Sequence, residues 1–124
     1  MPRILLVEDD DQLRPMLKLL LTTAGYEVWE ARDGRGVGDL YEHHHPNLVI
    51  TDLVMPDKDG LEVIMDLRRR DPKVRIIAMS GGGQGSAECY LKIARKLGAQ
   101  RTLSKPFGDN EFLEAVLLVV EAEE

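Results

Sequence analysis

Acidic, hydroxyl and basic side chains follow four short apolar runs of this sequence. Glu8 and Asp9 come directly after the first run, and Asp52, Ser80 and Lys105 follow later ones. A carboxylate at the end of a buried run is costly to desolvate unless a partner compensates its charge. The pattern therefore predicts that these groups share one site.

The residue types at this site indicate phosphoryl chemistry. Clustered carboxylates such as Glu8, Asp9 and Asp52 raise one another's pKa values unless a hard cation holds them. Oxygen ligands suit Mg²⁺, which takes only one or two protein carboxylates. A lysine can balance the charge of a phosphoryl group, a hydroxyl can bond its oxygens, and a carboxylate can be its acceptor. These groups predict Mg²⁺-dependent phosphoryl transfer to Asp52, assisted by Ser80 and Lys105.

Strand-like and helix-like segments alternate along the chain and must position these groups. Apolar runs without alternation predict strands covered on both faces, and apolar residues three or four positions apart predict amphipathic helices. Strands are expected at 4–7, 27–31, 48–51, 74–79 and 100–103, and helices at 12–24, 36–44, 60–70, 86–97 and 110–122. Five strand–helix pairs predict an α/β fold, a doubly wound parallel sheet with helices on both faces and right-handed crossovers.

The parallel sheet explains how distant residues would meet. All strands of such a sheet end at one edge, and ligands bind at that edge. Glu8, Asp9, Asp52, Ser80 and Lys105 would then converge on one pocket. Asp52 would be tolerated there because it shares the site with Lys105 and a bound cation.

Size and composition narrow the classes of protein. We expect one domain over residues 1–124, without an output domain, either as a stand-alone protein or as a fragment of a longer one. The formal charge of −6 argues against direct nucleic-acid binding, and no apolar stretch is long enough for a membrane span. The single cysteine cannot form an internal disulfide, so we expect a cytoplasmic protein. We also expect a monomer or a weak dimer.

The chain resembles the receiver domain of two-component response regulators over essentially its whole length. The motifs that carry the resemblance are, in order, Val7-Glu8-Asp9, Asp52 followed by Met55-Pro56 and Asp59-Gly60, Ser80 after an apolar strand, and Lys105-Pro106-Phe107. The resemblance implies a flavodoxin-like fold with five strands in the order 2-1-3-4-5 and five helices. It also implies a phosphorelay switch that catalyses its own phosphorylation and dephosphorylation, and is not a turnover enzyme.

The resemblance also implies individual roles. Asp52 would be the phosphoacceptor, and Asp9 a direct Mg²⁺ ligand. Glu8 would act on the metal through water, and the backbone carbonyl of Val54 would complete the metal site with Asp52. Ser80 and Lys105 would contact the phosphoryl group. The donor would be a histidine kinase or a histidine phosphotransfer protein, and a further protein, unknown from the sequence, would receive the signal.

One position departs from the family pattern. The family usually has an aromatic residue three positions before the lysine, and Thr102 stands there. Threonine lacks the volume to drive an aromatic rotamer switch, so we expect the 81–85 loop and the helix at 86–97 to carry most of the response. We also expect a cis peptide bond between Lys105 and Pro106, because X–Pro bonds tolerate cis at a cost of about 0.5–1 kcal/mol.

A Mg²⁺-dependent phosphohydrolase of the aspartyl-phosphate type is the alternative function. Such hydrolases carry a second aspartate two residues after the nucleophile as general acid, and Val54 at that position has no proton to give. The chain also lacks an insertion that could enclose a substrate. We favour the switch, and turnover of a phosphomonoester would separate the two hypotheses.

Several conspicuous features have simpler interpretations. The glycine-rich segment 81–85 lacks the lysine of a P-loop, so we interpret it as a mobile loop beside Ser80. Consecutive residues of a helix point in different directions, so 43–45, three histidines, is interpreted as a solvated helix end. Cys89 and Trp29 are interpreted as packing residues. Asp10 and Asp11 are interpreted as helix-cap and surface residues.

Overall fold

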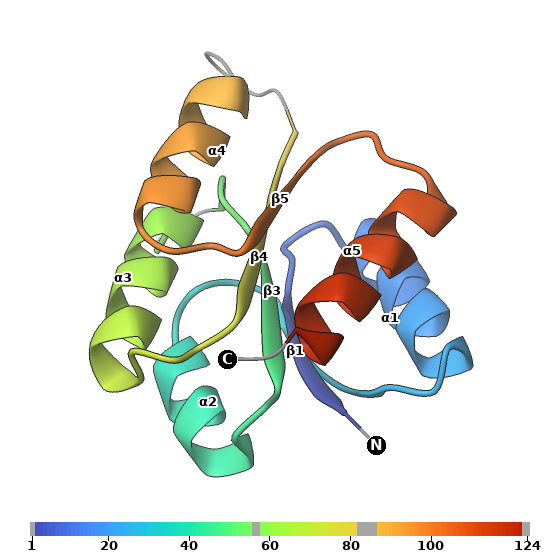
Figure 1. Ribbon diagram of the computed structural model, residues 1–124, viewed down its shortest axis with the longest axis horizontal. Helices are drawn as coiled ribbons and strands as arrows, with labels where there is room; N and C mark the ends of the chain where they lie inside the picture. Colours follow the sequence, from blue (N-terminus) through green and yellow to red (C-terminus); the bar gives the residue numbers. More distant parts are fainter. Residues whose placement is uncertain (1, 56–57, 82–86, 123–124) are drawn as a thin grey trace.

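Strands and helices alternate along the described chain (Figure 1). The computed structural model describes residues 2–55, 58–81 and 87–122. The elements within these residues are β1 Arg3–Val7, α1 Leu13–Thr23, β2 Glu27–Ala31, α2 Val37–His44, β3 Leu48–Asp52, α3 Gly60–Arg70, β4 Ile76–Ser80, α4 Ala87–Lys96, β5 Arg101–Ser104 and α5 Asp109–Glu121. Every predicted strand and helix is present, with bounds that differ by one or two residues at most ends.

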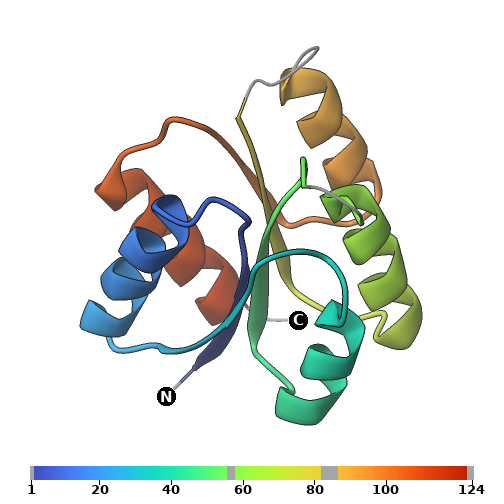
Figure 2. The ribbon, with the colours of Figure 1, turned by 180° about the vertical axis from the view of Figure 1, so that it is seen from behind.

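The five strands form one parallel sheet in the order β2-β1-β3-β4-β5, which confirms the predicted fold and strand order. Helices α1 and α5 cover one face, and α2, α3 and α4 cover the other (Figures 1 and 2). β4 begins two residues later than predicted. The reason is that Val74, although buried, belongs to a turn in which its N–H donates to the Asp71 carbonyl oxygen at 3.1 Å.

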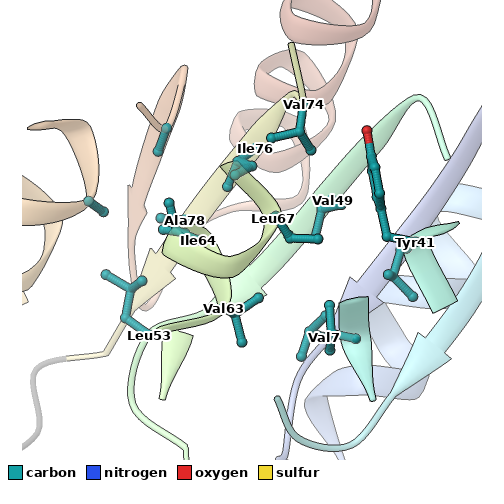
Figure 3. Packing of buried hydrophobic residues seen from close by; sticks show 14 of the residues in the cluster. Val7, Tyr41, Val49, Leu53, Val63, Ile64, Leu67, Val74, Ile76 and Ala78 are labelled. Carbon is teal, nitrogen blue, oxygen red and sulfur yellow. The ribbon is translucent and has the colours of Figure 1, made fainter. Parts of the chain in front are cut away.

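The sheet separates two apolar layers. Leu5 and Val7 of β1 pack in the layer beneath α2, α3 and α4 (Figure 3), while Ile4 and Leu6 pack in the layer beneath α1 and α5. Because both faces of β1 are covered, its sequence is a continuous apolar run and not an alternating one. The same constraint makes β3 and β4 fully buried and places their last residues at the edge of the core.

Helix α3 begins where the chain turns back over the end of β3. Asp59 caps this helix by accepting a hydrogen bond from the Glu62 N–H at 3.0 Å. The next residue, Gly60, packs against the β3 backbone, and a Cβ at this position would lie 2.2 Å from the Asp52 carbonyl oxygen. Only glycine permits this approach of helix to strand, and the approach fixes the backbone of Asp52.

Membrane insertion by a helix has no support in the described residues. None of their helices is both long and apolar enough to cross a bilayer.

We expect Gly60→Ala to destabilise the protein by about 1–3 kcal/mol, because the added methyl group would force α3 away from β3. Alanine is the better helix former by about 1 kcal/mol, so propensity alone predicts the opposite sign. Gly108→Ala is the matched control, because nothing lies within 4 Å of a Cβ built there. Urea unfolding followed by circular dichroism measures both variants, and equal effects would contradict the close-packing argument.

Candidate functional site

The carboxyl ends of four strands meet at one edge of the sheet. Glu8 follows β1, Asp52 ends β3, Ser80 ends β4 and Lys105 follows β5. The Lys105 N–H donates to the Ser80 carbonyl oxygen at 2.9 Å, which holds the two strand ends together. The predicted convergence of these residues is therefore present in the fold.

The ammonium group of Lys105 lies between two buried carboxylates. Its Nζ donates a hydrogen bond to Glu8 Oε1 at 2.7 Å and forms an ion pair with Asp52 Oδ1 at 3.3 Å. Glu8 is 0% exposed and Asp52 is 4% exposed. The expected pairing of Lys105 with Asp52 is confirmed, and the shorter contact with Glu8 is additional.

Three carboxylates gather at this edge. Glu8, Asp9 and Asp52 each offer an oxygen atom, and these atoms lie within 4.8 Å of one another. One ammonium group cannot neutralise three carboxylates, so a hard cation with oxygen ligands fits the remaining charge. Asp52 Oδ1 is buried and accepts no hydrogen bond from the described residues, although Lys105 Nζ lies nearby. This donor set suits Mg²⁺.

The hydroxyl group of Ser80 is a further unsatisfied group at this edge. Its side chain is buried, and its Oγ has no hydrogen-bond partner among the described residues. A buried hydroxyl without a partner is uncommon in a folded protein and is often explained by a bound group. Ser80 therefore has a donor available for an incoming acceptor.

Burial dominates the titration of the site. It raises the pKa of Asp52 from its ordinary 3.8 to about 7, and the charge of Glu8 adds to this effect while Lys105 opposes it. Burial also raises the pKa of Glu8, against the hydrogen bond from Lys105. For Lys105, burial alone would lower the pKa, but the hydrogen bond to Glu8 and the charge of Asp52 raise it overall. The ammonium group therefore stays charged, and Asp52 is only partly ionised near neutral pH.

The loop after β1 holds Glu8 in place. The Glu8 N–H donates to the Ala31 carbonyl oxygen at 3.0 Å, and its Oε2 accepts the Asp10 N–H at 3.1 Å. Arg14 Nη1 donates to the Glu8 carbonyl oxygen at 2.8 Å, so α1 is tied to the loop. Sequence reasoning missed Arg14, because an arginine in a first helical turn does not reveal which backbone group it reaches.

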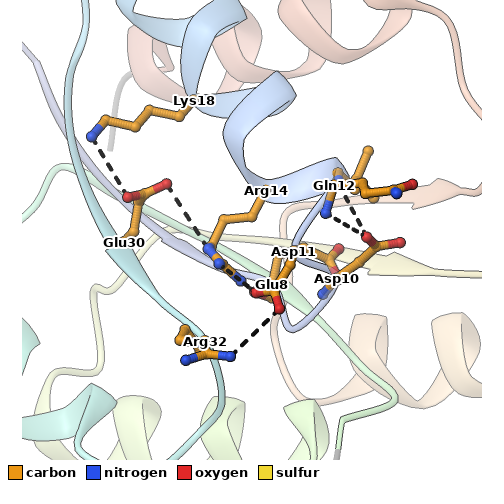
Figure 4. A network of polar contacts seen from close by, with 9 residues as sticks. Glu8, Asp10, Asp11, Gln12, Arg14, Lys18, Glu30 and Arg32 are labelled. Atoms are coloured by element: carbon orange, nitrogen blue, oxygen red, sulfur yellow. Dashed lines mark hydrogen bonds and ion pairs between the residues drawn. The ribbon is translucent and has the colours of Figure 1, made fainter.

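The same loop caps α1 (Figure 4). Asp10 Oδ1 accepts the N–H groups of Gln12 at 2.8 Å and Leu13 at 3.1 Å, which confirms the interpretation of Asp10 as a cap. Asp11 is exposed and forms an ion pair with Arg14 at 2.7 Å. Of the four acidic residues after β1, Glu8 and Asp9 therefore belong to the site, whereas Asp10 and Asp11 interact with the start of α1.

The segment after β5 confirms one prediction and adds a ring contact that the sequence did not predict. The peptide bond between Lys105 and Pro106 is cis, as predicted. The next residue, Phe107, stacks its ring on that of Phe112 in α5, with ring centroids 5.5 Å apart.

Thr102, at the position where the family usually has an aromatic residue, has a polar partner in the structure. Arg95 Nη1 on α4 donates to Thr102 Oγ1 at 2.8 Å, and Arg95 Nη2 donates to Glu88 Oε1 at 3.0 Å. A charged link therefore joins α4 to β5 where the family usually has an aromatic side chain. The glycine-rich loop that was expected to move with α4 lies outside the described residues, apart from Gly81.

Other predicted residues have mixed outcomes. The Val54 side chain is exposed, and the role of its carbonyl as a metal ligand stays a prediction. Trp29 packs against the core and stacks on His44 at 4.4 Å. Cys89 is exposed, so its interpretation as a packing residue is wrong. Cys89 lies two positions before the buried Leu91, which places it on the opposite side of α4.

The fold and the site together define an α/β domain that gathers carboxylates, a lysine and a serine at the carboxyl edge of a five-stranded parallel sheet. The model of the response regulator receiver domain family matches residues 4–117. The chain therefore belongs to the receiver domain family of response regulators, which act in two-component signalling.

Individual relatives agree with this assignment. The chain is 36% identical over 115 residues to the chemotaxis protein CheY of Thermotoga maritima, covering 92% of this chain and 93% of that protein. It is 29% identical over 114 residues to the sporulation initiation phosphotransferase F of Bacillus subtilis, covering 92% and 90%. The non-phosphorylated HemR receiver domain from Leptospira biflexa superposes with a TM-score of 0.87 at 31% identity, covering 100% and 98% of the two chains.

We expect Asp52→Asn to stabilise the protein at pH 8 by up to about 4 kcal/mol, because each unit of pKa shift is worth about 1.4 kcal/mol. The folded state raises the pKa of Asp52 from 3.8 to about 7, so it binds the proton more tightly than the unfolded state does. Stability is therefore lost as pH rises through this window, and the difference between variant and parent vanishes near pH 4. Urea unfolding in EDTA at both pH values measures the effect.

The control for this measurement is Asp71→Asn. The hydrogen bond from Tyr41 lowers the pKa of Asp71. Replacing this carboxylate by an amide should therefore change the free energy of unfolding in the opposite direction. We expect this variant to be less stable than the parent at pH 8. An Asp52→Asn variant that is also less stable at pH 8 would refute the raised pKa of Asp52.

Proposed function

We propose that this receiver domain is a phosphorelay switch in which Asp52 accepts a phosphoryl group in a Mg²⁺-dependent reaction. The observation that carries the proposal is the environment of Asp52 Oδ1. This atom is buried, accepts no hydrogen bond from the described residues and lies 3.3 Å from Lys105 Nζ, beside two further carboxylates. The family of the chain supports the same reaction.

The reaction is a transfer from a phosphohistidine. An oxygen of Asp52 forms the new bond to phosphorus, the bond between phosphorus and the histidine nitrogen breaks, and its electron pair stays on the imidazole. When bound, Mg²⁺ supplies positive charge opposite the phosphoryl oxygens. Asp9 and Asp52 would hold the metal directly, Glu8 through water, and the Val54 carbonyl would complete the set.

Two side chains of the site then act on the phosphoryl group. Lys105 stays charged and can exchange part of its contact with Asp52 for a phosphoryl oxygen. Ser80 has a hydroxyl donor that the described residues leave unused. Both groups recognise the added oxygens, so the domain acts as a signalling switch that catalyses its own modification.

We expect acetyl phosphate with Mg²⁺ to add one phosphoryl group to the protein, and Asp52→Asn or EDTA to abolish the addition. Asp71→Asn is the control, because it removes a carboxylate that is bonded to Tyr41 and lies outside the acidic cluster. Intact-mass spectrometry reads the stoichiometry. Undiminished labelling of Asp52→Asn, or steady turnover of a phosphomonoester by the parent, would overturn the proposal.

The protein that donates the phosphoryl group would dock on α1, next to the site that contains Asp52. A cavity of about 580 Å³ opens beside α1. Its lining is mainly apolar but includes charged residues, and consists of Leu13, Met16, Leu17, Pro106, Phe107, Gly81, Lys105, Asp10 and Asp109. Met16 is 50% exposed, and Leu19 on the same helix is also exposed. An apolar surface that shares Lys105 with the acceptor site suits a donor that must bring its phosphohistidine to Asp52. The donor would be a histidine kinase or a phosphotransfer protein in the cytoplasm.

We expect Met16→Glu to slow transfer from the protein donor by about tenfold or more, because it puts a charge into an apolar contact. Labelling by acetyl phosphate should not change. Met65→Glu is the matched control, because Met65 is 47% exposed on α3 and does not line this cavity. The histidine kinases of the source organism are first phosphorylated and compared, and the one that labels the parent protein fastest serves as the donor. The rate of phosphoryl transfer from this kinase is then measured for both variants. Equal slowing of both variants would contradict docking on α1.

The output would leave the site through α4 and β5. Thr102 is the register partner of Ala78, two residues before Ser80, and Arg95 ties it to α4. A shift of Ser80 toward the phosphoryl group would change β4 next to this link. We therefore propose that phosphorylation changes the α4–β5 surface through the Glu88–Arg95–Thr102 contacts, and that the downstream protein reads this surface.

A further inference from the structure

The side chain of Arg14 connects three segments beside the acidic site (Figure 4). Its guanidinium group donates to the Glu8 carbonyl oxygen at 2.8 Å and to Asp11 Oδ1 at 2.7 Å, and it forms an ion pair with Glu30 of β2 at 3.9 Å. The Arg14 N–H also donates to the Asp10 carbonyl oxygen at 3.0 Å. Helix α1, the loop after β1 and strand β2 therefore meet at one guanidinium group.

This guanidinium group is largely enclosed by the protein. The side chain of Arg14 is only 12% exposed, whereas that of Lys18, one turn further along α1, is 44% exposed. Burying a charged group is costly unless the group is paired and hydrogen-bonded, and Asp11 and Glu30 supply the pairing. Because several partners fix the planar guanidinium group at once, it can hold a neighbouring group in one orientation.

The Glu8 carbonyl group belongs to the peptide bond that leads into Asp9. A peptide bond is planar, so a hydrogen bond to this carbonyl oxygen orients the whole peptide unit, including the N–H of Asp9. Glu8 has further anchors, because its N–H donates to the Ala31 carbonyl oxygen and its carboxylate accepts from Lys105. The carboxylate of Asp9 accepts no N–H hydrogen bond from the described residues. Its position therefore depends on the backbone that Arg14 holds.

Arg14 contacts the acidic site through the backbone and not through a carboxylate of that site. Lys105 reaches the carboxylates of the acidic cluster directly and compensates part of their charge. The charge of Arg14 is compensated instead by Asp11 and Glu30, which lie outside the cluster. The loop after β1 is thus anchored while the carboxylates of the cluster keep their charge for a cation.

We propose that Arg14 is a positioning residue of the metal site, because it holds the peptide before Asp9 and keeps the carboxylates of Glu8 and Asp9 gathered with that of Asp52. This role rests on the proposed function, in which Asp9 is a direct Mg²⁺ ligand. Groups that orient metal ligands from behind typically change the metal affinity by about 10–100-fold when they are removed. Arg14 touches neither the metal nor the phosphoryl group in this role.

The sign of the effect separates positioning from simple electrostatics. A guanidinium group beside a cation site repels the cation, so electrostatics alone predicts tighter metal binding by Arg14→Met. Positioning predicts weaker binding by this variant, because the loop after β1 loses its anchor. Arg14→Lys keeps the charge but cannot donate in the fork geometry of a guanidinium group. Positioning therefore predicts weaker binding by Arg14→Lys as well, whereas charge alone predicts the affinity of the parent.

Mn²⁺ serves as the probe, because it shares the oxygen ligands of Mg²⁺ and its free concentration is measured by electron paramagnetic resonance without any phosphoryl donor. We expect the parent to bind Mn²⁺ at a site that Asp9→Asn removes, and both Arg14 variants to bind it about tenfold more weakly. Arg32→Gln is the matched control and should bind like the parent, because Arg32 also pairs with Asp11 but is exposed.

The possible results distinguish this role from the proposed function. Arg14→Met that binds Mn²⁺ as tightly as the parent or more tightly, or an equal loss in Arg32→Gln, would overturn the role of Arg14 alone. A parent without saturable Mn²⁺ binding, or Asp9→Asn that binds like the parent, would overturn the metal site of the proposed function and this role with it.

Amide hydrogen exchange in EDTA separates positioning from a general loss of stability. The Asp10 N–H donates to Glu8 Oε2 at 3.1 Å, so it reports the order of the loop after β1. We expect Arg14→Met to accelerate exchange at this amide more than at the amides of β3 and β4, and Arg14→Lys gives the same comparison with the charge retained. Equal acceleration at all of these amides would identify a merely structural side chain and would overturn the proposal.

Discussion

The ammonium group of Lys105 stabilises the carboxyl edge of the sheet, because it lies within ion-pair distance of two carboxylates that are almost completely buried. Removing this ammonium group would leave two buried carboxylates without a counter-charge, and an uncompensated buried charge typically destabilises a protein by about 3–5 kcal/mol. The ammonium group also connects the ends of three strands, since Glu8 follows β1, Asp52 ends β3 and Lys105 follows β5. Stability therefore depends on this contact, and the proposed phosphoryl transfer would use the same groups. The contact compensates only part of the negative charge of the three carboxylates.

The two ends of the sheet have opposite electrostatic character. Carboxylates collect where the strands end, and basic side chains collect where β4 and β5 begin. An apolar sheet with a covered core separates the two regions, so their charges do not compensate each other directly. The acidic end keeps the negative potential needed to attract a cation. The polar link from Arg95 to Thr102 lies at β5, a strand that extends between the two ends.

The sequence predicted the elements and the membership of the site because both follow from short-range patterns. Apolar runs indicate buried strands, and the common edge of a parallel sheet brings Asp52 and Lys105 together. The strand order came from the family resemblance, because periodicity does not specify which strands are neighbours. The contacts of Arg14 and Arg95 were not predictable, since a long side chain can reach several groups and packing selects one. The same limit explains Cys89, whose side of α4 is decided by which helix face packs on the sheet.

The contact between Lys105 and Glu8 joins residues that are 97 positions apart in the chain. Glu8 is made near the beginning of synthesis, but its carboxylate has no ammonium partner until the last strand has been made and has paired with β4. Closing a loop of this length has an entropic cost that only the assembled sheet can offset. A nascent or partly unfolded chain therefore has its aspartates but not the assembled site that is proposed to accept the phosphoryl group. Under the proposed function, only a completely folded chain can therefore receive the phosphoryl group, and an incomplete chain cannot take part in signalling.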